Sequence, residues 1–105
     1  MEALSRLEMA LQKQEQILCK ALHTDLGKSK TESVMCEIGL VQGEIRWMKQ
    51  HLGRLCRQKH VRTSLAQFAA KSYQSPSPYG NVLIMSPWNY PVLLTLEPLV
   101  DAIAA

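Results

Sequence analysis

The sequence has few cysteines, little net charge and no long apolar run. Its 105 residues include three cysteines, an odd number without a Cys-x-x-Cys pair, which excludes a disulfide framework and a Cys-x-x-Cys metal or redox motif. No unbroken apolar run exceeds four residues, whereas a membrane-spanning helix needs about 20. The N-terminus shows no apolar segment typical of a secretory signal. We therefore expect a cytoplasmic protein without a membrane span.

Charge and proline are unevenly distributed along the chain. Residues 1–62 hold 11 of the 12 Lys and Arg residues and 7 of the 9 Asp and Glu residues, and all five prolines follow Ser75. The length allows at most one small domain. Within it we expect a helical N-terminal region at 1–62, a connector strand and turn at 63–80, and an apolar segment at 81–105.

The charged half predicts two long antiparallel helices. In the first, leucines recur at helical spacing at Leu4, Leu7, Leu11, Leu18 and Leu22. Gly27 suits a left-handed C-terminal cap, and Ser29 with Glu32 forms the Ser-x-x-Glu pattern of a capping box that opens the second helix. The apolar series of that second helix is Val34, Ile38, Val41, Ile45, Met48, Leu52 and Leu55. We attribute Gly39, Gly43 and Gly53 to close packing between helices.

The second half predicts a β-hairpin-like segment, followed by a buried strand and a helix. Phe68–Gln74 is the first strand, residues 75–80 are rich in turn residues, and Val82–Met85 reads as a strand buried on both faces. Val92–Ala105 is helical in pattern, with Asn89 or Tyr90 at its N-cap and a kink expected at Pro98. Strand, tight loop and helix begin a βαβ unit whose partner strands are missing. We therefore expect the chain to be a fragment of a larger α/β protein, itself mostly α.

Two further groups of residues allow alternative functions. Cys56 and His60 stand four residues apart, as two metal ligands on a helix would, but no third ligand is well placed, so we expect no metal site. Six basic residues occur within residues 46–62 without an acid: Arg46, Lys49, Arg54, Arg57, Lys59 and Arg62. A small nucleic-acid binder could use them, but we interpret them as a solvated face and expect no nucleic-acid partner. A free-standing helical interaction module is the other alternative.

One segment makes a family resemblance specific. Residues 80–91, Gly-Asn-Val-Leu-Ile-Met-Ser-Pro-Trp-Asn-Tyr-Pro, resemble the start of the coenzyme domain of aldehyde dehydrogenases, nearest the fatty-aldehyde and aromatic-aldehyde branch with Trp-Asn-Tyr-Pro. Residues 98–105 resemble the helix that follows there, and residues 21–29 and 37–39 resemble the helical N-terminal region. The resemblance spans nearly the whole chain but only the first part of a much longer enzyme. It implies that residues 81–105 are the truncated start of a Rossmann-like domain that binds NAD or NADP.

The resemblance also implies roles for individual residues. Aldehydes would be oxidised to carboxylic acids with NAD or NADP through a cysteine thiohemiacetal, and the side-chain amide of Asn89 would stabilise the oxyanion. The remaining site residues are Ser86, Pro87, Trp88 and Asn89 beside the coenzyme, and Tyr90 and Leu94 beside the aldehyde. An ordinary N-cap asparagine, a core tryptophan and apolar core residues are the corresponding structural alternatives.

The expected fragment would lack the nucleophilic cysteine, the general-base glutamate and the Gly-rich coenzyme loop of the family. We expect the 105 residues alone to be inactive and to bind no coenzyme. The uncovered apolar strand and helix predict a homo-oligomer, because an open strand edge pairs readily with another chain.

Overall fold

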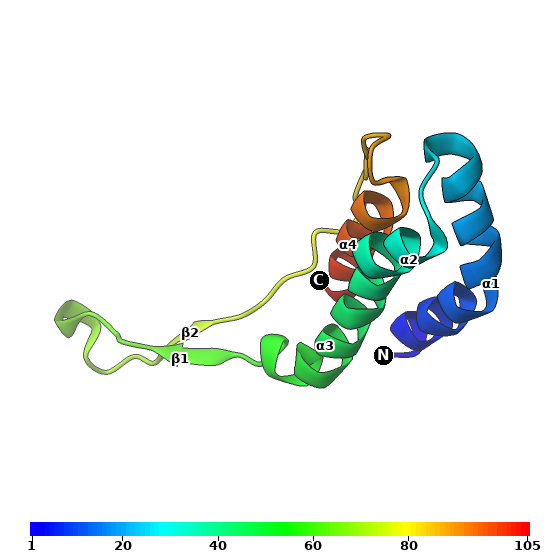
Figure 1. The fold of residues 1–105 in the computed structure, drawn as a ribbon. Helices are drawn as coiled ribbons and strands as arrows, with labels where there is room; N and C mark the ends of the chain where they lie inside the picture. Colours follow the sequence, from blue (N-terminus) through cyan, green and yellow to red (C-terminus); the bar gives the residue numbers. More distant parts are fainter.

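The computed structural model describes all 105 residues, and it consists of a helical bundle with a protruding hairpin (Figure 1). The elements in chain order are α1 (Glu2–Leu26), α2 (Lys30–Ser33), η1 (Val34–Ile38), α3 (Gly39–Leu55), β1 (Lys59–Val61), η2 (Leu65–Gln67), β2 (Ser72–Gln74) and α4 (Pro91–Ala104). The molecule extends over 64 × 24 × 22 Å because the hairpin projects from one end of the bundle. No helix combines the length and the apolarity that a bilayer crossing requires.

The two long helices of the first half are confirmed, and they run in opposite directions (Figure 1). Gly27 ends α1 with φ +69°, and its N–H donates to the carbonyl oxygen of His23 over 2.9 Å. The Ser29 hydroxyl accepts a hydrogen bond from the Glu32 N–H over 3.1 Å, which fixes the first turn of α2. Both ends of the turn between the helices thus follow from local capping chemistry.

The second helix contains a π-helical turn, η1, between α2 and α3. The Gly39 N–H donates to the carbonyl oxygen of Val34, five residues earlier. A Cβ atom at Gly39 would meet that oxygen, whereas Gly43 and Gly53 have no heavy atom within 4 Å of the position a Cβ would take. Close packing between helices was therefore the wrong explanation for the glycines. Gly39 is needed because of the backbone of its own helix, whereas Gly43 and Gly53 have open space beside them.

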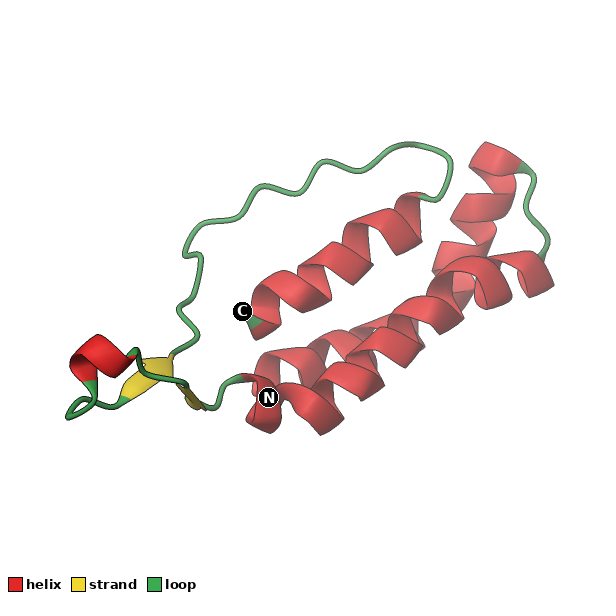
Figure 2. Cartoon of the chain, turned by 90° about the vertical axis from the view of Figure 1, so that its left-hand side faces the viewer, coloured by secondary structure: helices red, strands yellow, loops and turns green.

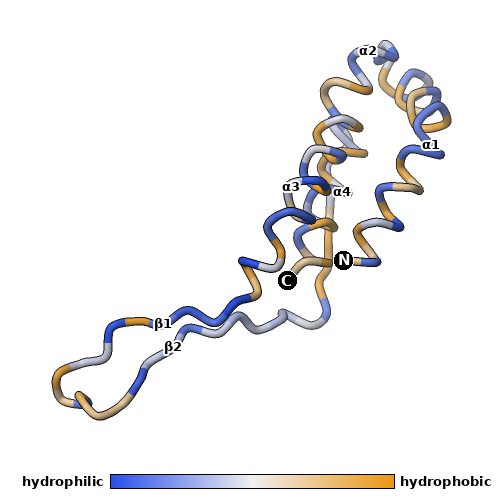
Figure 3. The backbone as a smooth tube through the Cα atoms, turned by 90° about the horizontal axis from the view of Figure 1, so that it is seen from below, coloured by the Kyte–Doolittle hydropathy of each residue, from blue (hydrophilic) through white to orange (hydrophobic).

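The core lies where α1, α3 and α4 meet. It consists of Leu4, Leu11, Cys19, Ile38, Val41, Ile45, Met48 and Val100. Apolar and polar residues alternate along α1 and α3, whereas α4 is mostly apolar (Figure 3). The helix α4 packs along α3 and continues through Pro98. The helical half therefore packs against the apolar helix within a single chain, because α1, η1 and α3 all contact α4 and Val100 belongs to their shared core.

The predicted strand at Val82–Met85 is absent. These residues form part of a long extended connection between β2 and α4 (Figure 2), and no other segment of the chain hydrogen-bonds to them. Leu83 and Met85 are more than four-fifths exposed. A strand requires a partner for its backbone groups, and the 105 residues contain none for this segment.

The only sheet is a two-stranded antiparallel hairpin, β1 with β2, in which His60 lies opposite Tyr73. Phe68–Gln74 was therefore too long as a strand, because Phe68 follows η2 at the hairpin tip and only Ser72–Gln74 pairs. The hairpin begins at Lys59, before residue 63, where the sequence placed the connector. No strand was predicted at 59–61, because Lys59 and His60 are polar and all three residues are exposed, so the segment shows no alternation between buried and exposed positions.

The helical half differs from the sequence analysis in one side-chain arrangement. Cys56 and His60 do not share a helix face, because α3 ends at Leu55 and His60 belongs to β1. Of the three cysteines, Cys19 is in the core, Cys36 is half-buried and Cys56 is exposed. Lys49 of the basic segment forms a 2.8 Å ion pair with Glu8 of α1, so it ties two helices together.

Candidate functional site

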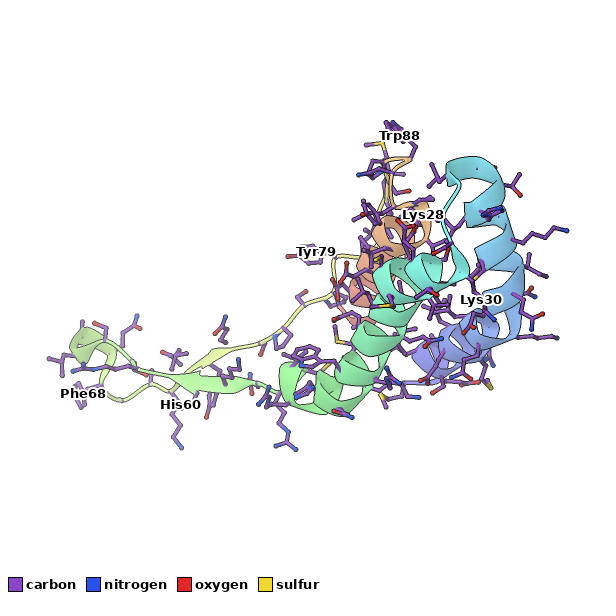
Figure 4. The ribbon with its side chains drawn as sticks, in the orientation of Figure 1. Lys28, Lys30, His60, Phe68, Tyr79 and Trp88 are labelled. Atoms are coloured by element: carbon purple, nitrogen blue, oxygen red, sulfur yellow. The ribbon has the colours of Figure 1, made fainter.

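The predicted site residues lie on the loop before α4 and on its first turn. The loop projects above the start of α4, and Trp88 points outward from it (Figure 4). Trp88 is 81% exposed, so the alternative of a core tryptophan is wrong for these 105 residues. Pro91 begins the helix, and Tyr90 occupies the N-cap position without a side-chain capping bond. A different residue must therefore satisfy the first amides of α4.

Glu37, from η1, caps α4 across the bundle. One carboxylate oxygen, Oε2, accepts hydrogen bonds from the backbone N–H of Val92 over 2.8 Å and from that of Leu93 over 3.2 Å. The Glu37 side chain is completely buried. A carboxylate at this place is favoured by the positive end of the helix dipole as well as by its two donors.

Lys28, from the turn after α1, completes the arrangement. Its ammonium lies 2.5 Å from Oε1 of Glu37, donates to the carbonyl oxygen of Asn89 over 3.0 Å, and lies 3.8 Å from the centre of the Tyr90 ring. The Lys28 side chain is only 9% exposed. Three segments distant in sequence therefore meet at the start of α4: the turn after α1 with Lys28 (labelled in Figure 4), η1 with Glu37, and the chain from Asn89 into the first turn of the helix.

This cluster is electrically neutral and fully bonded. Each buried charge has an opposite charge beside it and further hydrogen-bond partners, which is the condition for placing an ion pair in a protein interior. Removal of one partner would leave the other charge buried and unpaired, at a cost of about 3–5 kcal/mol. The pair therefore holds the turn after α1, η1 and the loop before α4 in one fixed relation.

No amide remains free at the start of α4 to bind an anion. Pro91 has no N–H, Val92 and Leu93 donate to Glu37, and Leu94 donates to the carbonyl oxygen of Tyr90 over 2.9 Å. Glu37 already uses the positive end of the helix dipole, so an oxyanion beside this loop would depend on donors of the loop itself. Among these, the Asn89 side-chain amide makes no hydrogen bond within the chain.

The other predicted site residues surround Asn89 without enclosing a space. The Ser86 and Thr95 hydroxyl oxygens are 2.6 Å apart, which ties the loop to α4. Tyr90 is 37% exposed under its contact with Lys28, and Leu94 is half-buried. None of the cavities in the chain is lined by residues 86–94. Within these 105 residues the predicted site is a surface.

Lys28 and Glu37 were missed as site residues at the sequence level. A signal for Glu37 was present, because it lies three residues after Val34 and four before Val41, which places a carboxylate within the apolar stripe of the helix. Lys28 gave no such signal, since a lysine after a helix cap is ordinarily solvated. Only the folded chain shows that its ammonium reaches η1 and the Asn89–Tyr90 backbone.

A second group of charges lies further along α4. Burial raises the pKa of the Glu44 carboxyl above its usual value, and the nearby carboxylates of Asp101 and Glu97 raise this pKa further. These three acids belong to α3 and α4, which pack against each other. The group affects stability and lies apart from the loop at residues 86–90.

The comparisons identify the family of this chain. The sequence model of the aldehyde dehydrogenase family matches residues 1–105, so the chain belongs to the aldehyde dehydrogenase family. The 4,4'-diaponeurosporen-aldehyde dehydrogenase of Staphylococcus aureus (strain NCTC 8325 / PS 47) is 43% identical over 104 residues, which are 99% of this chain and 23% of that protein. Aldehyde dehydrogenase family 3 member B1 of Homo sapiens is 41% identical over 95 residues, 90% of this chain and 20% of that protein.

A solved structure agrees with the fold. The substrate-bound state of Staphylococcus aureus AldH superposes with a TM-score of 0.94 at 43% identity, over 98% of this chain and 22% of that one. The chain thus spans about a fifth of the length of the relatives it matches. The helices, the hairpin and the extended connection are therefore arranged as in a member of the family.

Proposed function

We propose that the protein containing this chain oxidises aldehydes to carboxylic acids with NAD or NADP through a cysteine thiohemiacetal. The observation that carries the proposal is the position of Asn89, immediately before α4, with its backbone held by Lys28 and its side-chain amide left free of partners. Family membership supports it, as do the names of two relatives, 4,4'-diaponeurosporen-aldehyde dehydrogenase and 4,4'-diapolycopene-4,4'-dial dehydrogenase. The nucleophilic cysteine and the general base would come from outside these 105 residues.

Asn89 would donate its side-chain N–H to the oxyanion that forms when a thiolate adds to the aldehyde. A preorganised donor of this kind is worth about 3–4 kcal/mol of transition-state stabilisation. The neighbouring amides of α4 cannot substitute for it, because Glu37 and the Tyr90 carbonyl already accept from them. Tyr90 and Leu94, half-exposed and half-buried at the start of α4, would line the path of the aldehyde.

The residues present suit one wall of a coenzyme site. Between Lys71 and Glu97 the chain has no charged residue, and the first amides of α4 are occupied, so this wall has neither a cation nor a free helix N-terminus for a pyrophosphate. The exposed Trp88 and the exposed backbone at Ser86 and Pro87 would instead pack beside the adenosine portion. NAD(P)⁺, when bound, supplies the hydride acceptor. We also propose that residues 81–105 begin a Rossmann-like domain whose sheet would pair with Val82–Met85.

The proposal is tested by Asn89→Ala in the full-length protein. We expect kcat to fall by about 10²- to 10³-fold, as is typical for loss of one oxyanion donor, with the dissociation constant of the coenzyme unchanged. Asn81→Ala is the matched control, since Asn81 is an exposed asparagine at the other end of the same extended segment. An unchanged kcat in Asn89→Ala would remove Asn89 from the catalytic groups.

A further inference from the structure

The loop at residues 86–90 has one hydrogen bond to the part of the bundle that precedes it in the chain, apart from its bonds to α4. The Ser86 hydroxyl bonds to Thr95 and the Tyr90 carbonyl accepts from Leu94, and both of these partners belong to α4 itself. The bond from the Lys28 ammonium to the Asn89 carbonyl oxygen is the only hydrogen bond that a side chain from outside residues 86–105 makes to the loop. The orientation of the loop on the bundle therefore depends on Lys28.

Lys28 is itself held in place from three directions. Its backbone follows Gly27, which is fixed in the left-handed conformation, and its carbonyl oxygen lies 3.1 Å from Nδ1 of His23. Its ammonium is bound to Glu37, whose other carboxylate oxygen caps Val92 and Leu93. The same ion pair thus contacts the residues on both sides of the Tyr90–Pro91 bond, which fixes the backbone that carries the Asn89 side chain.

We propose that Lys28 and Glu37 are positioning residues for the reaction: together they set the place from which the Asn89 amide donates to the oxyanion. This inference rests on the proposed function. The ammonium does not itself take the role of oxyanion partner, because its charge is paired with Glu37 and its donors are directed to Glu37 and to the Asn89 backbone. The reacting carbonyl would therefore meet a neutral amide donor whose position is fixed by a buried ion pair.

The π turn η1 provides the placement of Glu37. It contains one residue more per turn than an α-helix, and such turns often occur at functional sites. Glu37 lies within this turn and Gly39 follows it, where only glycine avoids the Val34 carbonyl oxygen. The π turn therefore positions the Glu37 carboxylate, which binds Lys28, and Lys28 in turn donates to the Asn89 carbonyl oxygen.

The test is a double-mutant cycle in the full-length enzyme, with kcat per coenzyme-binding site as the readout. The variants are Glu37→Gln, the charge-free pair Lys28→Met with Glu37→Gln, and each of these combined with Asn89→Ala. Glu37→Gln alone leaves the Lys28 ammonium buried without an opposite charge, and this variant can fail to fold. The charge-free pair leaves no unpaired charge, so it should fold even where the single variant does not. Glu8→Gln is the matched control, because Glu8 also forms an ion pair with a lysine, Lys49, but between α1 and α3 and away from the loop.

We expect Glu37→Gln and the charge-free pair to lower kcat by roughly 10- to 100-fold, the range for a small misplacement of a reacting group, with coenzyme affinity unchanged. In the Asn89→Ala background the same changes should lower kcat by less than about threefold, since no donor remains to be misplaced. Glu8→Gln should leave kcat within about twofold.

Two results would overturn the inference. One is an unchanged kcat in the charge-free pair, and the other is an equal loss of kcat with and without Asn89, which would indicate a general structural role. These results differ from a failure of the proposed function, which is an unchanged kcat in Asn89→Ala alone.

Discussion

The carbonyl oxygen of Val34 lies 2.7 Å from the position that a Cβ atom would occupy at Gly39. This contact arises because the Gly39 N–H donates to the carbonyl oxygen of Val34, five residues earlier. In an α-helix the bond would go to the residue four earlier. The neighbour is a backbone atom, which cannot move aside as a flexible side chain would. Position 39 therefore requires glycine as long as η1 keeps its π turn.

Gly39→Ala should destabilise the chain, whereas Gly53→Ala should stabilise it. At Gly39 the added methyl forces the backbone apart, at a cost of about 1–3 kcal/mol, typical of overpacking. At Gly53, in the last turns of α3, no heavy atom lies within 4 Å, so alanine should add about 0.5–1 kcal/mol through its helix propensity. Urea unfolding followed by circular dichroism at one fixed protein concentration measures both. A stabilising Gly39→Ala would show that the π turn relaxes into an α-helix without cost.

Glu44→Gln should raise stability at neutral pH. The folded-state pKa of the Glu44 carboxyl is raised above its ordinary value of 4.5 by burial and by Asp101 and Glu97, so the folded chain favours the protonated form. The stability that this group contributes is complete below pH 4.5 and is lost as the pH rises through the raised pKa. The variant should therefore exceed the parent at pH 7 and lose this advantage in acid.

The measurement is the unfolding free energy of both proteins across that pH range. Glu15→Gln on α1 serves as the control for removing one carboxylate, because Glu15 lies away from the three acids at the junction of α3 and α4. An advantage of Glu44→Gln that did not change with pH would contradict the assignment of this pKa.

The 105-residue chain alone should form a homo-oligomer, a dimer in the simplest case. Val82, Leu83 and Met85 are 51%, 81% and 84% exposed, and the backbone around them is unpaired. An apolar extended segment with free amides and carbonyls pairs readily with a second copy. Sedimentation equilibrium at micromolar concentration should give a mass above 11.8 kDa.

Leu83→Pro should shift this equilibrium toward the monomer, since proline cannot donate to a strand ladder. Ile17→Lys is the matched control, because Ile17 is also a large exposed apolar side chain, at 66%, but on α1. A monomer for the parent chain would contradict the prediction and would mean that the segment is tolerated in water as a single extended strand.

Local chemistry decided the parts that the sequence predicted correctly. The leucine stripe of α1, the cap at Gly27 and the hydroxyl of Ser29 act within a few residues, so the two helices and the turn between them could be read directly. Pro91 at the first position of α4 is another local signal, because proline suits the first turn of a helix. The motif at residues 80–91 identified the family because its residue types are specific in themselves.

Long-range contacts decided the rest. Whether Val82–Met85 forms a strand depends on a partner strand, and no pattern within four residues can supply one. The cap of α4 is Glu37, 55 residues before Val92, and the donor to Asn89 is Lys28, 61 residues earlier. A buried charge is stable only where an opposite charge and further donors meet it, and that meeting exists only once α1, η1 and α4 are packed. The residues of the loop around Asn89 can therefore be recognised from the motif, whereas the contacts that hold this loop arise only when the chain folds.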